Sequence, residues 1–117
     1  MFARLTAPIL IGSLALAAFA APAFAAVDAD AAKALAKKND CFKCHAIDKT
    51  KKGPSYQKIS NKYKAPDKKA TAEEKMMKHL TSSPKVKLED GTEEDHKALE
   101  GVSKPDLTNL IQWILSN

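Results

Sequence analysis

The sequence predicts a small all-α domain of three main helices, one short helix and long loops. Apolar residues recur at helical spacing in three segments, and no alternating pattern indicates a strand. In residues 26–117, Leu, Ile, Val and Phe make up only about 16% of the chain, below the roughly 20% under which highly charged chains tend to stay unfolded. Such a chain needs apolar surface from a bound group to close its core.

The first 25 residues are predicted to be a cleaved export signal. Arg4 and the amino terminus give a positive start, Ile9 to Ala21 is apolar, and Ala23-Phe24-Ala25 matches the small-x-small cleavage pattern. The mature domain then spans residues 26–117 and lies in the bacterial periplasm. Because Leu5 to Val27 carries no charge, an uncleaved membrane anchor remains the alternative.

The first helix is expected from Asp28 to Lys38. A lysine-rich loop follows and closes at Gly53-Pro54, a turn signal. Ser55 to Lys62 is expected to form the short helix, which Pro66 breaks. The apolar residues at helical spacing in the first helix are Ala31, Ala34 and Leu35.

The other two helices have recognisable starts. Thr71, followed by Glu73 and Glu74, resembles an N-cap and predicts a helix to Leu80 or Thr81. Its apolar face consists of Met76, Met77 and Leu80. An irregular acidic stretch then leads to a second cap-like start, in which Ser103 opens the strongest amphipathic helix. The apolar residues of that helix are Leu107, Leu110, Ile111, Ile114 and Leu115, with Trp113 alongside.

Residues 41–45 read Cys-Phe-Lys-Cys-His, the C-x-x-C-H signature of covalent c-type haem attachment. This spacing lets the thiols of Cys41 and Cys44 bond the two vinyl groups of one porphyrin edge, while His45 binds the iron as proximal ligand. Two alternatives stay open. A redox disulfide usually accompanies a βαβ pattern, and a structural zinc site would need a fourth ligand from His79 or His96. The motif, the export signal and the apolar-poor composition favour one covalent haem c with its iron.

With these features the chain resembles the class I cytochromes c over nearly all of residues 28–117. In that family a Gly-Pro pair follows the attachment motif, and the proline carbonyl usually accepts the proximal histidine's ring N–H. The resemblance therefore implies that Pro54 orients His45, the kind of second partner that tunes a ligand. Three further residues are expected to contact the haem: Tyr56, Met77 and Leu80.

The chain departs from the family pattern at the distal ligand, which is usually a methionine in the last loop. No methionine follows Met77, but His96 lies 17 residues before Trp113, close to the family's methionine-to-aromatic spacing. We therefore expect His96 to bind the iron, giving bis-histidine ligation. Met76 or Met77, His79, and an open or water-bound iron remain the alternatives.

Charge is distributed unevenly along the mature chain. Residues 26–69 carry 12 lysines against 5 acids, whereas residues 70–117 carry 6 lysines against 9 acids. No arginine follows Arg4, so the bidentate contacts typical of specific nucleic-acid readers are missing. The lysines flanking the attachment motif are placed to dock acidic proteins: Lys37, Lys38, Lys43, Lys49, Lys51 and Lys52.

Together these features predict a periplasmic monohaem electron carrier rather than an enzyme, because no nucleophile–base pair is visible. The expected partners are acidic-faced or multihaem redox proteins in transient, salt-sensitive complexes. We expect a monomer that contacts neither nucleic acid nor, after signal removal, a membrane. A haem-based sensor or small-ligand binder with a labile or open distal site is the alternative function. An attached redox subunit of a larger enzyme is a third.

Overall fold

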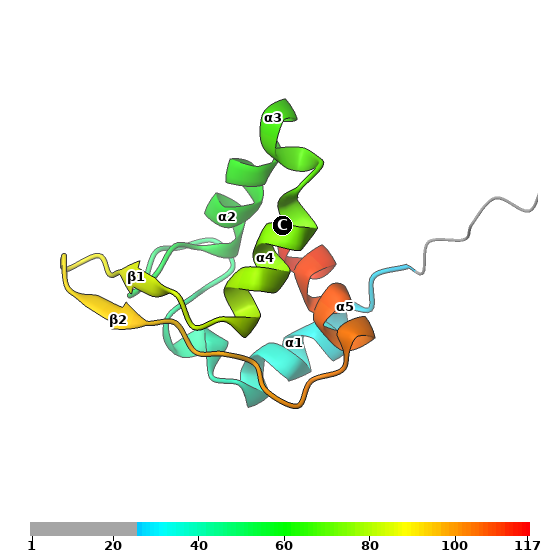
Figure 1. Ribbon diagram of the computed structural model, residues 1–117, viewed down its shortest axis with the longest axis horizontal. Helices are drawn as coiled ribbons and strands as arrows, with labels where there is room; N and C mark the ends of the chain where they lie inside the picture. The colour runs from blue at the N-terminus through cyan, green and yellow to red at the C-terminus, as the bar shows by residue number, and fades with distance from the viewer. Residues whose placement is uncertain (1–25) are drawn as a thin grey trace, which may run out of the picture.

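The computed structural model describes residues 26–117. The predicted signal and its cleavage after Ala25 therefore lie outside the described residues. The elements, in chain order, are α1 (Ala29–Lys38), the 3₁₀ turn η1 (Cys41–Lys43), α2 (Tyr56–Tyr63), α3 (Pro66–Lys69), α4 (Ala72–Thr81), β1 (Lys85–Lys87), β2 (Glu93–Asp95) and α5 (Lys104–Leu115). Figure 1 shows their arrangement. No helix within residues 26–117 has both the length and the apolar character needed to span a bilayer.

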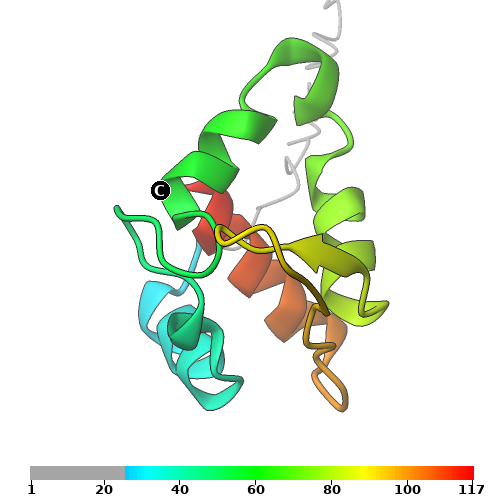
Figure 2. The same cartoon turned by 90° about the vertical axis from the view of Figure 1, so that its left-hand side faces the viewer.

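Helix α5 is the centre of the molecule, because α1, α2 and α4 all pack against it. Figure 2 shows α2 and α4 on opposite sides of α5, with α3 joining them at the top of the view. Five residues of α5 are buried, namely Leu107, Leu110, Ile111, Trp113 and Ile114. This is the predicted amphipathic face, and only Leu115 of the predicted set is partly exposed.

The contact between α1 and α5 is close because small residues form it. Ala32 and Ala36 of α1 are fully buried. At the start of α1, the Asp28 N–H donates to the Asn109 side-chain oxygen at 2.9 Å, and the Asn109 amide donates back to the Asp28 carbonyl at 2.9 Å. These paired hydrogen bonds fix the start of the domain to its last helix.

The predicted face of α1 is wrong by one position. Ala31 and Ala34 are exposed and Leu35 is half-buried, whereas the buried residues are Ala32 and Ala36. Half of the ten residues of α1 are alanines, so the alanine pattern alone does not define which face is turned toward the core.

The other predicted helices are confirmed, with two differences in detail. Ser103 caps α5 by accepting a hydrogen bond from the Asp106 N–H, but Thr71 makes no side-chain cap at α4. The short helix α2 ends before Pro66, as predicted. Pro66 is also the first residue of α3, a position where its missing N–H costs nothing.

The stretch expected to be irregular contains a short antiparallel hairpin, which sequence analysis missed. Strands β1 and β2 pair Lys85 with Asp95 and Lys87 with Glu93, and the Lys85 ammonium lies 3.0 Å from the Asp95 carboxylate. Gly91 adopts a positive φ of 86° in the connection. Both strands are mostly exposed, so opposite charges across the pair, rather than alternating apolar residues, accompany the pairing.

Candidate functional site

The two cysteines of the motif lie on one tight turn. Asp40 precedes η1 in the left-handed conformation, with φ 60°, and the His45 N–H donates to the Cys41 carbonyl at 2.9 Å. Cys41 and Cys44 are both partly buried and are not bonded to each other. Burial raises the pKa of Cys41 above its ordinary value, unlike the lowered thiol pKa of redox-active C-x-x-C pairs.

His45 follows this turn, and its ring is held from three directions. Its Nδ1 lies 2.6 Å from the Pro54 carbonyl oxygen, so a protonated Nδ1 donates to that carbonyl and Nε2 keeps its lone pair. Gly53 lies against the ring, since a Cβ there would be 2.9 Å from the His45 Cε1 atom. Tyr56 stacks on the ring with centroids 5.4 Å apart and an interplanar angle of 21°. The Nε2 of His45 is thereby available to bind a metal ion.

Tyr56 joins this side of the site to the core. Its ring is buried and makes an edge contact with Trp113 of α5, with centroids 5.3 Å apart. A second edge contact, at 6.0 Å, is with Phe42 of η1. Burial, followed by the neighbouring Cys41 sulfur, raises the pKa of the Tyr56 phenol, so the phenol is neutral at physiological pH.

His96 lies on the loop that follows β2, far from His45 in the sequence. Its N–H donates to the Pro84 carbonyl at 2.8 Å, and the Leu99 N–H donates to the Leu80 carbonyl at 2.8 Å. These two hydrogen bonds fasten the loop to the end of α4. The His96 Nδ1 lies 3.0 Å from the Lys97 carbonyl oxygen, which again leaves Nε2 free.

The structure brings the rings of His45 and His96 together across the site, with centroids 6.2 Å apart and planes at 44°. His79 of α4 lies beside them, with its ring centroid 4.5 Å from that of His96. Partial burial, and then the neighbouring imidazoles, lower the pKa of His79. Partial burial, together with the charge of His45, lowers the pKa of His96. Neutral imidazoles are the form that binds metal ions.

The remaining predicted site residues lie on α4. Met76 and Leu80 are buried and belong to the apolar core around α5. Met77 is partly buried and packs at the edge of that core. The structure therefore places Met76 among core residues, while a histidine occupies the position facing His45.

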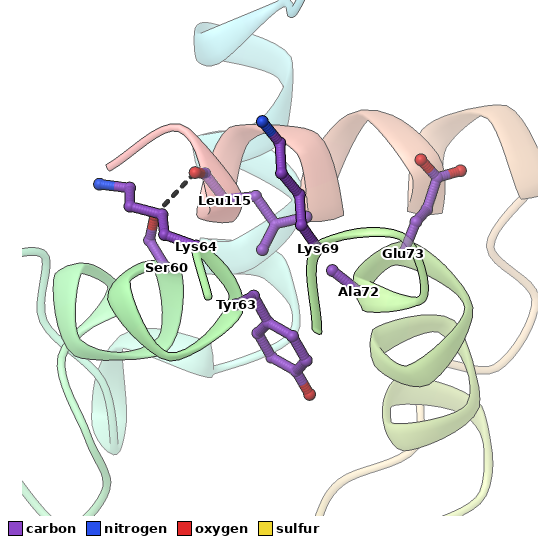
Figure 3. Close-up of a pocket in the computed structure, with 7 residues that line it drawn as sticks. All are labelled: Ser60, Tyr63, Lys64, Lys69, Ala72, Glu73 and Leu115. Carbon is purple, nitrogen blue, oxygen red and sulfur yellow. Dashed lines mark hydrogen bonds between the residues drawn. The ribbon is translucent and has the colours of Figure 1, made fainter. Parts of the chain in front are cut away.

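A pocket of about 410 Å³ lies elsewhere, at the corner where α2, α3, α4 and the end of α5 meet (Figure 3). Its lining residues are Ser60, Tyr63, Lys64, Lys69, Ala72, Glu73 and Leu115. None of the predicted site residues lines it. The buried Ser60 hydroxyl donates to the Leu115 carbonyl at 2.7 Å, which ties α2 to the end of α5 beside this pocket.

Comparison with known proteins identifies the family. A model of the cytochrome c family matches residues 29–117. The chain belongs to the cytochrome c family. Among solved structures it is similar to the class 1 cytochrome MtoD from Sideroxydans lithotrophicus ES-1, with 52% identity over 78% of this chain and 97% of that one, and a TM-score of 0.73. It is also similar to cytochrome c552 from Nitrosomonas europaea, with 28% identity, coverage of 76% and 98%, and a TM-score of 0.56. A search of curated proteins finds no match.

These relationships confirm the class I cytochrome c fold and the cofactor, which is covalent haem c with its iron. Class I cytochromes c are electron-transfer proteins, so the cytochrome is a haem-based electron carrier. The expectations of cofactor and family drawn from the C-x-x-C-H motif are therefore confirmed. The family match favours covalent haem over the zinc alternative.

The geometry of the two histidines is compatible with this cofactor. With metal–nitrogen bonds of about 2 Å, imidazoles on opposite sides of one metal ion have ring centroids about 6 Å apart, and the centroids of His45 and His96 are 6.2 Å apart. Both cysteines lie on the turn directly before His45. The donor set and its spacing thus fit a haem held at one edge and ligated from two sides.

Two contacts near this site could not be predicted from the sequence. His79 was expected only as a competing ligand, and no sequence signal reveals its contact with His96, 17 positions later. The second is the salt bridge of Lys97 with Asp40, at 3.5 Å, which links the His96 loop to the residue before Cys41. Such contacts depend on tertiary structure rather than on a local pattern.

Proposed function

We propose that this cytochrome is a periplasmic shuttle that passes single electrons between redox proteins, with Cys41 and Cys44 bonded to the haem and His45 and His96 as axial ligands. The 6.2 Å separation of the two histidine rings is the observation that carries the proposal. The bound haem supplies the iron that takes up and returns one electron.

On the attachment side, the protein holds the ligand His45 in a fixed orientation. Its Nδ1–H donates to Pro54 at 2.6 Å, and this hydrogen bond increases the electron density of the ring and sets its tautomer. Gly53 and Tyr56 confine the same ring on its carbon edge and face. His45 therefore needs little rearrangement when the charge of the site changes, which favours rapid electron transfer.

On the other side, His96 replaces the methionine usual in the family. A thioether favours ferrous iron and raises the reduction potential, whereas imidazole is the better donor to ferric iron. We therefore expect a lower potential than that of a methionine-ligated relative, within the roughly 0.8 V that axial ligands span in haem proteins. With both axial positions filled, no open position is left for a small ligand or substrate.

Docking is proposed to use the lysines around the attachment turn. They are exposed on the last turn of α1, on η1 and on the loop after His45: Lys37, Lys38, Lys43, Lys49, Lys51 and Lys52. Acidic-faced or multihaem partners would be attracted to this surface and released quickly in salt. Export is proposed through cleavage after Ala25, so the mature protein recovered from the periplasm should begin at Ala26.

The discriminating experiment is carbon monoxide binding by the ferrous protein at neutral pH. A carrier with two histidine ligands should resist carbon monoxide, whereas His96→Ala should bind it readily, and the neighbouring control Lys97→Ala should behave like the unaltered protein. Ready binding by the unaltered protein would favour the alternative of a small-ligand sensor. A His96→Ala variant that still resists carbon monoxide would show that another residue ligates the iron.

A second experiment addresses docking. Reduction of the anionic oxidant ferricyanide should slow as salt is added, and slow further in Lys51→Gln/Lys52→Gln. The matched control Lys104→Gln lies on α5, away from the attachment turn, and should react at the unaltered rate. Equal rates in both variants would remove the lysine surface from the proposal.

A further inference from the structure

Hydrogen bonds to other segments hold the backbone of the His96 loop, but none of them holds the imidazole ring of His96. The hydrogen bonds to Pro84 and from Leu99 to Leu80 place the main chain. The ring's own hydrogen-bond partner is the carbonyl of Lys97, the next residue. That carbonyl belongs to the residue next to His96, so this hydrogen bond does not tie the His96 ring to any other element of the protein.

His79 contacts the same ring from a rigid element. It lies in the last turn of α4, a helix anchored in the core by the buried side chains of Met76 and Leu80. Its ring meets that of His96 edge to face, with centroids 4.5 Å apart and an interplanar angle of 62°. This is a favoured geometry for two aromatic rings, and it restricts rotation of the His96 ring about its own axis.

We propose that His79 is a positioning residue for the distal ligand, holding the His96 imidazole at a set angle to His45 so that His96 stays bonded in both oxidation states. The inference deepens the proposed function and rests on His96 being the distal ligand. Within it, α4 supplies on the distal side what Pro54, Gly53 and Tyr56 supply on the proximal side. His79 itself need not touch the iron.

Three variants test the role of His79. His79→Ala removes the ring, His79→Phe keeps an aromatic edge but no nitrogen, and Lys78→Ala alters the exposed neighbour on the same helix. The readouts are the g-anisotropy of the low-spin ferric electron paramagnetic resonance spectrum, which reports the angle between axial imidazole planes, and carbon monoxide binding by the ferrous protein. Thermal unfolding of each variant checks that α4 remains folded.

In His79→Ala we expect a shifted and broadened g-anisotropy, and a fraction of protein with His96 detached that rises about two- to tenfold, as carbon monoxide binding reports. His79→Phe should keep the unaltered g-anisotropy, and Lys78→Ala should match the unaltered protein in both readouts. A His79→Ala variant with the unaltered spectrum and unaltered carbon monoxide binding would overturn the positioning role while leaving His96 ligation intact.

If His96 is not the distal ligand, the variants should show a different pattern of spin states. If His96→Ala keeps the low-spin spectrum and only the double variant with His79→Ala becomes high-spin, His79 can act as a ligand itself. If His79→Ala becomes entirely high-spin while His96→Ala stays low-spin, His79 is the distal ligand. Either outcome contradicts the positioning role, and the second also overturns the assignment of His96.

Discussion

The two sides of the haem site are built in different ways. His45 is held by residues within 11 positions of it in sequence, through a hydrogen bond to Pro54, close contact with Gly53 and stacking on Tyr56. His96 is held by Pro84 and by His79 of α4, 12 and 17 positions earlier, and by the carbonyl of its own neighbour. The proximal side is therefore a local motif, whereas the distal side forms only when the loop packs onto α4.

This difference predicts unequal consequences when either of the two proposed ligands, His45 or His96, is removed. His45→Ala removes the histidine of the C-x-x-C-H attachment signature, so we expect the haem not to be attached. Without the haem the core lacks apolar surface, and the protein should be destabilised by more than about 4 kcal/mol. His96→Ala should keep covalent haem and native helix content, and only its spin state should change. Haem staining and circular dichroism of both variants measure the contrast, and equal loss of helix in both would contradict it.

The next largest effect is expected from exchanging the distal ligand. His96→Met should restore the family's usual pair and raise the reduction potential by on the order of 0.1 V or more, within the roughly 0.8 V span of axial ligation. Redox titration measures this shift. An unchanged potential, without the sulfur-to-iron band, would mean that the loop cannot deliver a methionine to the iron.

A smaller effect is expected at Gly53. An alanine there would put Cβ 2.9 Å from the His45 Cε1 atom, so the ring or the loop must shift, at a cost of about 1–3 kcal/mol. Gly101→Ala is the matched control. Its φ of 69° disfavours a side chain, but nothing lies within 4 Å, so it should cost about 1–2 kcal/mol without changing the haem spectrum. The proximal account fails if both variants leave that spectrum unchanged.

The smallest effect is expected at Asp40, whose ion pairs with Lys43 and Lys97 connect the two sides. Lys43 and then Lys97 lower the pKa of this carboxyl, so its contribution is present at neutral pH and is lost as pH falls through the lowered value. The group is exposed, so Asp40→Asn should shift the urea midpoint only slightly at pH 7, and this shift should shrink as the pH falls and the carboxyl becomes protonated.

The exposed aspartate Asp48 provides a control for that small effect, and Asp48→Asn should leave the midpoint unchanged at pH 7. A large loss in Asp40→Asn, with release of His96, would mean that the salt bridge and not α4 holds the distal loop.

The same local–tertiary contrast explains what the sequence could predict. The Cys41–His45 motif is a local signal, and it predicted the cofactor and the family. Apolar residues at helical spacing, clearest in the leucines and isoleucines of α5, predicted the three main helices. The face of α1 could not be determined because alanine carries little pattern, and the β1–β2 hairpin lacks alternating apolar residues. His96 was proposed as a ligand from a missing methionine and a spacing, whereas its contact with His79 is visible only in the folded structure.

The most direct test of the central claim is the far-red absorption spectrum of the purified ferric protein. The account predicts a low-spin haem without the weak sulfur-to-iron charge-transfer band, as expected for His45 and His96 on opposite sides of the iron. A sulfur-to-iron band would contradict it and would assign the distal position to Met76 or Met77 instead.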